Sequence, residues 1–245
     1  MNLLRAILFV LGALPITIAA PTLILLCLWA PLSWRIAIVR IWRELFMALV
    51  KHVLGIRYRV IGAENIPAEP AVILSKHQSA WETVALQEVF SPRWLCFVLK
   101  HELLLIPFLG WAFAALPMIA INRSSARDAL AQVLEKGKKR LAEGHFVVIF
   151  PEGTRVAPGQ KRRYKAGGAH LAVMSGALVI PVAHNAGECW PKNAFLKRPG
   201  WVTVSIGPPI DPKGLSVEEV NSRAEAWIEA EMQQISPHRY IAKTI

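Results

Sequence analysis

The sequence predicts an α/β fold, a mixed and mostly parallel sheet flanked by helices, with a membrane-associated helical segment in front of it. Three observations carry this prediction. Short apolar runs alternate with helical patterns after residue 54, the stretch Ala6–Trp34 has no charged residue over 29 positions, and 54% of all residues are hydrophobic. We therefore expect an anchoring helical segment at residues 1–54 and one α/β domain at residues 55–245.

Composition limits the class of protein. The apolar fraction exceeds the ~45–50% of soluble domains, and the mean hydropathy is +0.38, which excludes a disordered chain and favours contact with lipid. The net charge of +11 favours anionic partners such as nucleic acid, anionic lipid or phosphorylated substrates. The three cysteines lie far apart without a Cys-x-x-Cys pair, which argues against a disulfide scaffold and a thiolate zinc site.

The uncharged stretch Ala6–Trp34 is longer than the ~18 residues that indicate a membrane helix and longer than the ~7–15 of a signal-peptide core. Pro15, Pro21 and Pro31 interrupt it. Two arrangements remain open, a tilted span of the bilayer or a kinked hairpin that dips into one leaflet. A buried core helix followed by a surface helix is the alternative without a membrane.

The residues after this stretch indicate its orientation. Arg35, Arg40, Arg43 and Lys51 follow it, whereas only Arg5 precedes it, so the positive-inside rule places the body of the protein on the cytoplasmic side. The mixture of apolar and basic residues predicts an amphipathic interfacial helix with tryptophans near its start, over Ile36–Leu54.

Seven short apolar runs, bounded by turn residues, read as strands. In chain order they are Arg57–Val60, Ala71–Lys76, Trp94–Leu99, Pro117–Ile121, Phe146–Phe150, Val179–Ala183 and Val202–Ile206. Four segments with helical spacing lie between or after them, at Trp81–Phe90, Ala126–Glu143, Gly167–Ser175 and Val217–Gln234. Capping pairs mark two of the helix starts, Ser125 with Asp128 and Ser216 with Glu219.

The first chemical motif is His77 with Glu82, directly after a predicted strand. If His77 precedes the helix and Glu82 lies in its first turn, the carboxylate accepts from one ring nitrogen and leaves the other as a base. The residues also permit a structural interpretation, because Ser79 and Glu82 form a capping-box pattern and His77 is then a structural histidine.

The second motif, Phe-Pro-Glu-Gly-Thr-Arg, follows another strand at Phe150–Arg155. Gly153 permits a sharp loop with close ligand approach, and Arg155 offers a planar fork of donors suited to phosphate. The alternative is an ordinary turn with a surface arginine. Lys161, Arg162, Arg163 and Lys165 form a basic run nearby, which is either a solvated face or a contact for anionic headgroups.

Predicted strand ends also carry Lys100 and the pair Asn122 and Arg123. If these ends share one edge of the sheet with His77 and Arg155, a base lies beside several cations. Such a site suits an anionic substrate with an ionisable hydroxyl.

In this order, the motifs resemble the glycerophospholipid acyltransferases. The similarity covers roughly residues 57–210, through four blocks at His77–Glu82, Ile119–Arg123, Phe150–Arg155 and Val179–Val182. It implies that His77 is a general base oriented by Glu82. It also implies a substrate-binding set of Lys100, Asn122, Arg123, Glu152, Gly153, Thr154 and Arg155.

The resemblance implies transfer of an acyl chain from acyl-CoA or acyl carrier protein to 1-acyl-glycerol-3-phosphate, giving phosphatidic acid, without a cofactor or a metal. It places the enzyme in a bacterial-type inner membrane, with lipid and the acyl donor as partners and no nucleic acid. Apolar stretches at Leu103–Leu109 and Trp111–Leu116 line an acyl groove or belong to the core.

One departure concerns the acid, which is usually aspartate in the family and is Glu82 here. It leaves another lysophospholipid, a lyso-aminolipid or glycerol 3-phosphate open as acceptor. Readings outside the family are a basic nucleic-acid-binding protein, a zinc hydrolase using His77, Glu82 and His101 or His184, and a non-catalytic scaffold. The oligomeric state stays open.

Overall fold

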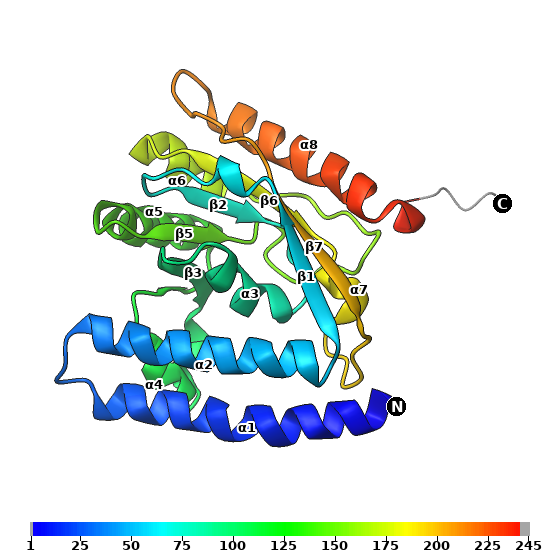
Figure 1. Ribbon diagram of the computed structural model, residues 1–245. Coiled ribbons are helices and arrows are strands. Elements are labelled where there is room, and N and C mark those ends of the chain that lie inside the picture. Colours follow the sequence, from blue (N-terminus) through cyan, green and yellow to red (C-terminus); the bar gives the residue numbers. More distant parts are fainter. Residues whose placement is uncertain (1, 241–245) are drawn as a thin grey trace.

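Seven strands form one sheet in the computed structural model, which describes residues 2–240, in the order β1-β7-β6-β2-β5-β3-β4 (Figure 1). All neighbouring strands are parallel except β6 and β7. This arrangement confirms the mixed, mostly parallel sheet. The strands are β1 (Ile56–Ile61), β2 (Val72–Ser75), β3 (Leu95–Lys100), β4 (Ile119–Ile121), β5 (Phe146–Ile149), β6 (Val179–His184) and β7 (Gly200–Ile206).

The four predicted helices of the domain are present within one or two residues of the expected bounds, as α3 (Trp81–Val89), α5 (Ala126–Ala142), α6 (Gly167–Ser175) and α8 (Val217–Ile235). Both expected caps form, because Ser125 Oγ accepts from the N–H of Asp128 and Ser216 forms a full capping box with Glu219. The sequence patterns did not predict the short elements, which are α4 (Leu109–Ala114), α7 (Ala186–Cys189) and the 3-10 turns at Ala63–Asn65, His101–Leu105 and Pro237–Arg239.

Helices cover both faces of the sheet (Figure 1), with α5, α6 and α8 on one and α2 and α3 on the other. Alternate residues of β2 therefore enter different cores: Val72 and Leu74 pack toward the first set of helices, and Ile73 packs toward the second. Burial on both faces explains why the parallel strands read as continuous apolar runs.

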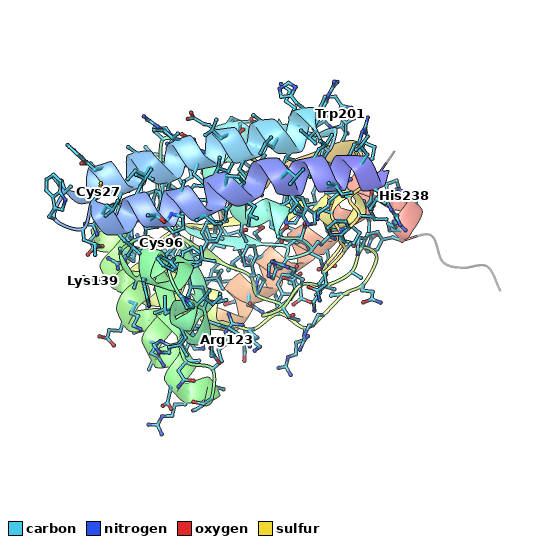
Figure 2. The ribbon with its side chains drawn as sticks, turned by 90° about the horizontal axis from the view of Figure 1, so that it is seen from below. Cys27, Cys96, Arg123, Lys139, Trp201 and His238 are labelled. Atoms are coloured by element: carbon cyan, nitrogen blue, oxygen red, sulfur yellow. The ribbon has the colours of Figure 1, made fainter. Side chains whose placement is uncertain are left out.

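The uncharged N-terminal stretch forms parts of two helices rather than one. Helix α1 (Asn2–Leu26) ends well before Trp34, and α2 (Leu32–His52) begins after Pro31. Figure 2 shows the two lying side by side. Leu3–Leu26 is long and apolar enough to cross a membrane, and only 22% of its most apolar window is buried. The pair has the shape of a hairpin, with Pro15 and Pro21 inside α1.

The helical pair also packs onto the α/β domain. Phe9 of α1 and Met47 and Val50 of α2 belong to the core beneath α3. Two of the four cations after the apolar stretch serve this packing: Arg35 donates to the carbonyl of Ala115 at 2.7 Å, and Arg43 is buried and donates to another backbone carbonyl at 2.8 Å. These two arginines therefore tie α2 to the domain, whereas Arg40 and Lys51 are exposed.

Candidate active site

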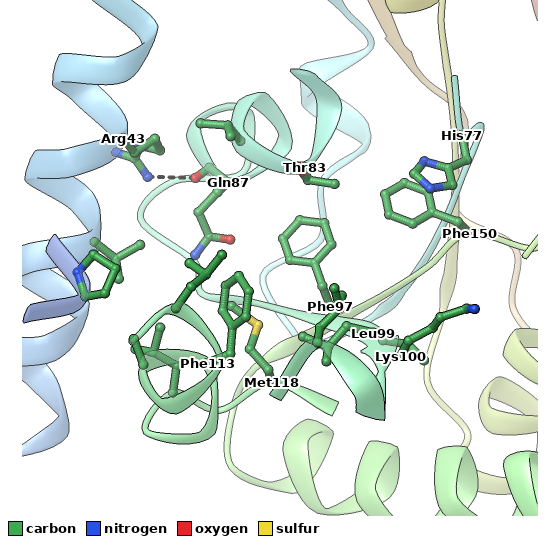
Figure 3. Close-up of a pocket in the computed structure, with 18 of the residues that line it drawn as sticks. Arg43, His77, Thr83, Gln87, Phe97, Leu99, Lys100, Phe113, Met118 and Phe150 are labelled. Atoms are coloured by element: carbon green, nitrogen blue, oxygen red, sulfur yellow. Dashed lines mark hydrogen bonds between the residues drawn. The ribbon is translucent and has the colours of Figure 1, made fainter. Parts of the chain in front are cut away.

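Four neighbouring parallel strands, β2, β5, β3 and β4, end at the same edge of the sheet. His77 lies two residues beyond β2, Lys100 is the last residue of β3, and Arg123 lies two residues beyond β4. The loop after β5 carries Arg155. The shared edge expected from the sequence is thus present, and these side chains line one cavity of about 570 Å³ (Figure 3).

The first pair at this edge is His77 with Glu82. His77 Nδ1 lies 2.7 Å from Glu82 Oε1, and the backbone N–H groups of Gln78 and Ser79 donate to the same oxygen at 3.1 and 2.9 Å. The structure supports the contact with the imidazole, whereas the capping box is incomplete. Glu82 accepts from the turn before α3, but Ser79 Oγ accepts from the N–H of Trp81 and not from that of Glu82. The position of Glu82 in the first turn follows from the short turn that separates β2 from the helix.

The charge of Glu82 fixes the tautomer of His77. Complete burial acts to raise the pKa of Glu82, but the hydrogen bonds from His77 and from the N–H of Ser79 outweigh burial and lower it. An ionised carboxylate only accepts hydrogen bonds, so His77 Nδ1 carries a proton and Nε2 keeps its lone pair. The His77 ring stacks on Phe150 with centroids 4.0 Å apart, and its side chain is 15% exposed.

The glycine of the second motif adopts a conformation that other residues rarely adopt, with φ of +70° at Gly153. Its carbonyl accepts from Arg123 Nη1 at 3.0 Å, which ties the end of β4 to the loop after β5. Burial lowers the pKa of Arg123, and Glu102 acts against this shift. Thr154 and Arg155 continue the loop along the cavity wall. The guanidinium groups of Arg123 and Arg155, the ammonium of Lys100 and the glycine loop thus line the same cavity as His77.

Two predicted substrate-binding residues lie outside the cavity lining. Asn122 Oδ1 accepts from the N–H of Ser124 at 2.9 Å and shapes the turn before α5. Glu152 is fully buried behind the loop, where its Oε1 lies 3.3 Å from Lys76 Nζ. Burial raises the pKa of Glu152 to about 7, and the Lys76 ammonium opposes the rise. Glu152 therefore lies behind the cavity wall, where it pairs with Lys76 and does not line the cavity.

Two further lysines lie near this loop, of which only Lys165 was singled out from the sequence, as part of the basic run. Lys192 lines the cavity with Nζ 3.5 Å from Thr154 Oγ1, and Lys165 lies over Gly153, where its Nζ is 3.3 Å from the position of a Cβ atom. Lys165 belongs to the basic run, so its charge pattern was visible. Nothing in the local sequence distinguishes Lys192 from a surface lysine.

The far end of the cavity is apolar. Leu103, Leu109, Ala112, Phe113 and Leu116 line it, so both stretches that the sequence offered as groove or core contribute to the wall. Figure 3 shows Phe113 and Met118 at this end and His77 with Lys100 at the other. Further wall residues come from α1 and α2, namely Thr17, Ala20, Pro21, Ile24, Val39 and Trp42.

The zinc-hydrolase reading needs His101 or His184 beside His77. Both ring nitrogens of His184 are engaged, since Nε2 lies 2.7 Å from the carbonyl oxygen of Lys76 and Nδ1 accepts from the N–H of Ala186. Burial lowers the pKa of His184, in keeping with a neutral ring. Within residues 2–240 no cluster of three or more His, Cys, Asp or Glu side chains is arranged to hold a metal ion.

Comparison with known proteins identifies the family. The family model for acyltransferases matches residues 57–185, more than half of the chain, and spans both motifs. The chain belongs to the acyltransferase family. This acyltransferase is 47% identical over 223 residues to a Pseudomonas aeruginosa protein named 1-acyl-sn-glycerol-3-phosphate acyltransferase, covering 85% of the chain and 86% of that relative.

More distant relatives carry the same name. The alpha enzyme of Mus musculus is 31% identical over 186 residues, which cover 75% of this acyltransferase and 65% of the mouse protein. A crystal structure of the 1-acyl-sn-glycerophosphate (LPA) acyltransferase from Thermotoga maritima has the same fold, with a TM-score of 0.79 over 96% of both chains and 24% identity. The likeness includes the N-terminal helices, since it covers nearly all of the chain.

Proposed function

We propose that this acyltransferase moves an acyl chain from an acyl thioester to the free hydroxyl of 1-acyl-glycerol-3-phosphate, giving phosphatidic acid. The observation that carries the proposal is the His77–Glu82 pair at the junction of a cationic and an apolar part of one cavity. The printed names of the relatives support the same acceptor.

In the proposed mechanism His77 acts through Nε2, which has no hydrogen-bond partner among the described residues. Nε2 removes the proton as the acceptor oxygen attacks the thioester carbonyl, and Glu82 stabilises the imidazolium that forms. The carbon–sulfur bond then breaks, and the proton passes from His77 to the departing thiolate. The acceptor oxygen is itself the nucleophile, so no enzyme nucleophile takes part.

The phosphate of the acceptor is proposed to bind near Arg155 and Arg123, with Lys100 and Lys192 at the rim. One donor of Arg123 is already held by the Gly153 carbonyl, and the rest of its fork is available for the ligand. This division suggests that Arg123 fixes the loop while Arg155 supplies most of the phosphate contact.

Arg155→Ala is expected to raise the KM for lysophosphatidate about 10- to 100-fold with a small effect on kcat, because loss of charge-assisted hydrogen bonds costs about 1.5–3 kcal/mol. Steady-state kinetics on purified enzyme in mixed micelles checks this. Arg162→Ala serves as the control, since Arg162 is exposed and lies outside the cavity lining. An unchanged KM in Arg155→Ala contradicts the phosphate role.

The apolar end of the cavity is proposed to hold the acyl chain being transferred. Ala112 is 2% exposed and lines this end, so Ala112→Leu fills part of the space. We expect the ratio of kcat/KM for short over long acyl donors to rise about tenfold, since each methylene in an apolar pocket is worth about 1 kcal/mol or more. Ala142→Leu on the exposed end of α5 is the control. An unchanged chain-length profile in Ala112→Leu places the chain elsewhere.

Membrane association and its sidedness complete the proposal. The exposed apolar surface of α1, together with Trp29 and Trp34 at the turn between the helices, supports a location in a bacterial-type inner membrane. We propose that the catalytic domain lies on the cytoplasmic side, where acyl-CoA and acyl carrier protein occur. Labelling of an exposed residue such as Lys213→Cys in intact and opened cells tests the side.

The decisive assay offers lysophosphatidate and labelled acyl-CoA to membranes that contain the enzyme. Phosphatidate formation by the wild type establishes the reaction. If none forms, the assay is repeated with acyl carrier protein as donor, and then with other lysophospholipids, a lyso-aminolipid and glycerol 3-phosphate. Product in one of those arms replaces the donor or the acceptor named here, and no product in any arm rejects the function.

A further inference from the structure

A cluster of buried charged side chains lies directly behind the active site. Lys76 Nζ is 2.7 Å from Glu229 Oε1 and 3.3 Å from Glu152 Oε1, and Tyr164 donates to the same Glu229 oxygen at 2.8 Å. Lys76 and Glu152 are completely buried, and Glu229 is 7% exposed. A lysine removed from water is costly unless it is paired, so this cluster requires a reason for its presence.

The first arm of the cluster, the contact from Glu229 to Lys76, leads to the candidate base His77. Lys76 is the residue immediately before His77, and its backbone is held on both sides, because its N–H donates to the Val182 carbonyl and its own carbonyl faces His184 Nε2. The bond from the Lys76 side chain to Glu229 adds an anchor from a separate layer of the fold. The His77 peptide therefore has its position set partly by α8.

The second arm, the contact from Glu229 to Tyr164, leads to the loop after β5. Tyr164 is followed by Lys165, whose N–H donates to the Pro151 carbonyl at 2.9 Å and whose side chain lies over Gly153. Glu229 thus supports the glycine loop through Tyr164 as well as through the shared ammonium. Both arms originate on one carboxylate of the C-terminal helix, which lies 153 residues along the chain from Lys76.

We propose that Glu229 is a positioning residue of the active site, which holds Lys76 and Tyr164 so that His77 and the Gly153 loop keep their relative positions in the cavity wall, where the N–H of Val156 donates to the His77 carbonyl at 2.7 Å. The inference rests on the proposed function and extends it to a helix outside the motifs. Lys76 is shared between two carboxylates, so loss of the Glu229 charge draws its ammonium toward Glu152. That movement shifts the peptide that carries His77.

The competing explanation is that the cluster only stabilises the packing of α8. Buried ion pairs are often replaced by apolar residues without loss of stability, whereas removal of one partner leaves an unpaired charge. The double variant Lys76→Met with Glu229→Leu therefore separates the two explanations. It removes the Lys76 and Glu229 charges together, and Glu152, whose pKa burial already raises to about 7, takes up a proton once the ammonium that opposes the rise is gone. Only a positioning role then predicts that a stable double variant is a poor enzyme.

We expect Glu229→Gln and the double variant to lower kcat/KM about 10- to 100-fold, the loss associated with a displacement of ~1 Å in a reacting group. Glu229→Asp, which keeps the charge, is expected to recover part of the rate. Glu231→Gln is the matched control, because Glu231 lies on the same helix and makes no ion pair among the described residues. Melting temperatures are measured for each variant, and a stable double variant with wild-type kcat/KM overturns the proposal.

Hydrogen–deuterium exchange of the full-length protein supplies a readout that does not depend on activity. Glu229→Gln is expected to raise deuterium uptake in peptides covering residues 76–82 and 150–156, whereas Glu231→Gln leaves both unchanged. An increase in deuterium uptake that is confined to α8 in Glu229→Gln overturns the proposal. If the wild-type enzyme transfers no acyl chain, the proposed function is rejected. The exchange experiment does not depend on that result and still decides whether Glu229 holds residues 76–82 and 150–156.

Discussion

Membranes that contain His77→Ala are expected to form phosphatidate about 100- to 10,000-fold more slowly than wild-type membranes, the range that a positioned general base contributes. The reason lies in the geometry around the ring. Glu82, which is itself held by two backbone N–H groups, fixes the imidazole through Nδ1, and Phe150 stacks on its face, so Nε2 is the atom left to accept the proton. Alanine removes that atom and leaves the cationic residues in place.

The measurement compares initial rates at equal enzyme content, with His52→Ala as the control. His52 is exposed in the last turn of α2, far along the chain from either motif. Immunoblots of washed membranes establish that each variant reaches the membrane. A His77→Ala enzyme with more than about a tenth of the wild-type rate contradicts the assignment, because a base worth so little is not the group that activates the hydroxyl.

Much of the fold was predictable because the central strands are buried on both faces. Val72–Ser75 and Phe146–Ile149 read as uninterrupted apolar runs, and the polar residues that follow each run mark the edge where the site lies. The sequence therefore located His77 and Arg155 without a structure. It did not reveal α4, a helix of six residues, which is too short for its periodicity to stand out.

Long-range pairing accounts for the residues that were missed. Lys76 was read as the end of a strand, and a lysine there is ordinarily solvated. Its partner Glu229 lies in a helix whose spacing predicts only a packing face, so no local pattern links the two. Asn122 shows the converse case, a residue whose local contact the sequence did not reveal. Its place beside Arg123 predicts a ligand contact, and in the structure its side chain accepts a hydrogen bond from the backbone of its own turn.

Glu82→Gln is expected to lower kcat by about tenfold to several thousand-fold, by analogy with other histidine–carboxylate pairs. The structure makes this variant informative. Two backbone N–H groups point at Oε1, so the glutamine must place its carbonyl oxygen there and its amide group at the Oε2 position. The His77 tautomer is then kept, and the loss measures the carboxylate charge that stabilises the imidazolium.

Ser216→Ala provides the control for a purely structural role, since Ser216 is the N-cap of α8 and lies outside the cavity lining. Loss of a cap costs about 0.5–2 kcal/mol of stability and leaves catalysis unchanged, so this variant lowers the melting temperature only. Glu82→Asp keeps the charge with one methylene fewer and is expected to stay within about tenfold of the wild type, because the charge supplies the larger part of the effect. A Glu82→Gln enzyme with the wild-type kcat reduces Glu82 to a structural residue of the turn before α3 and leaves His77 to act alone.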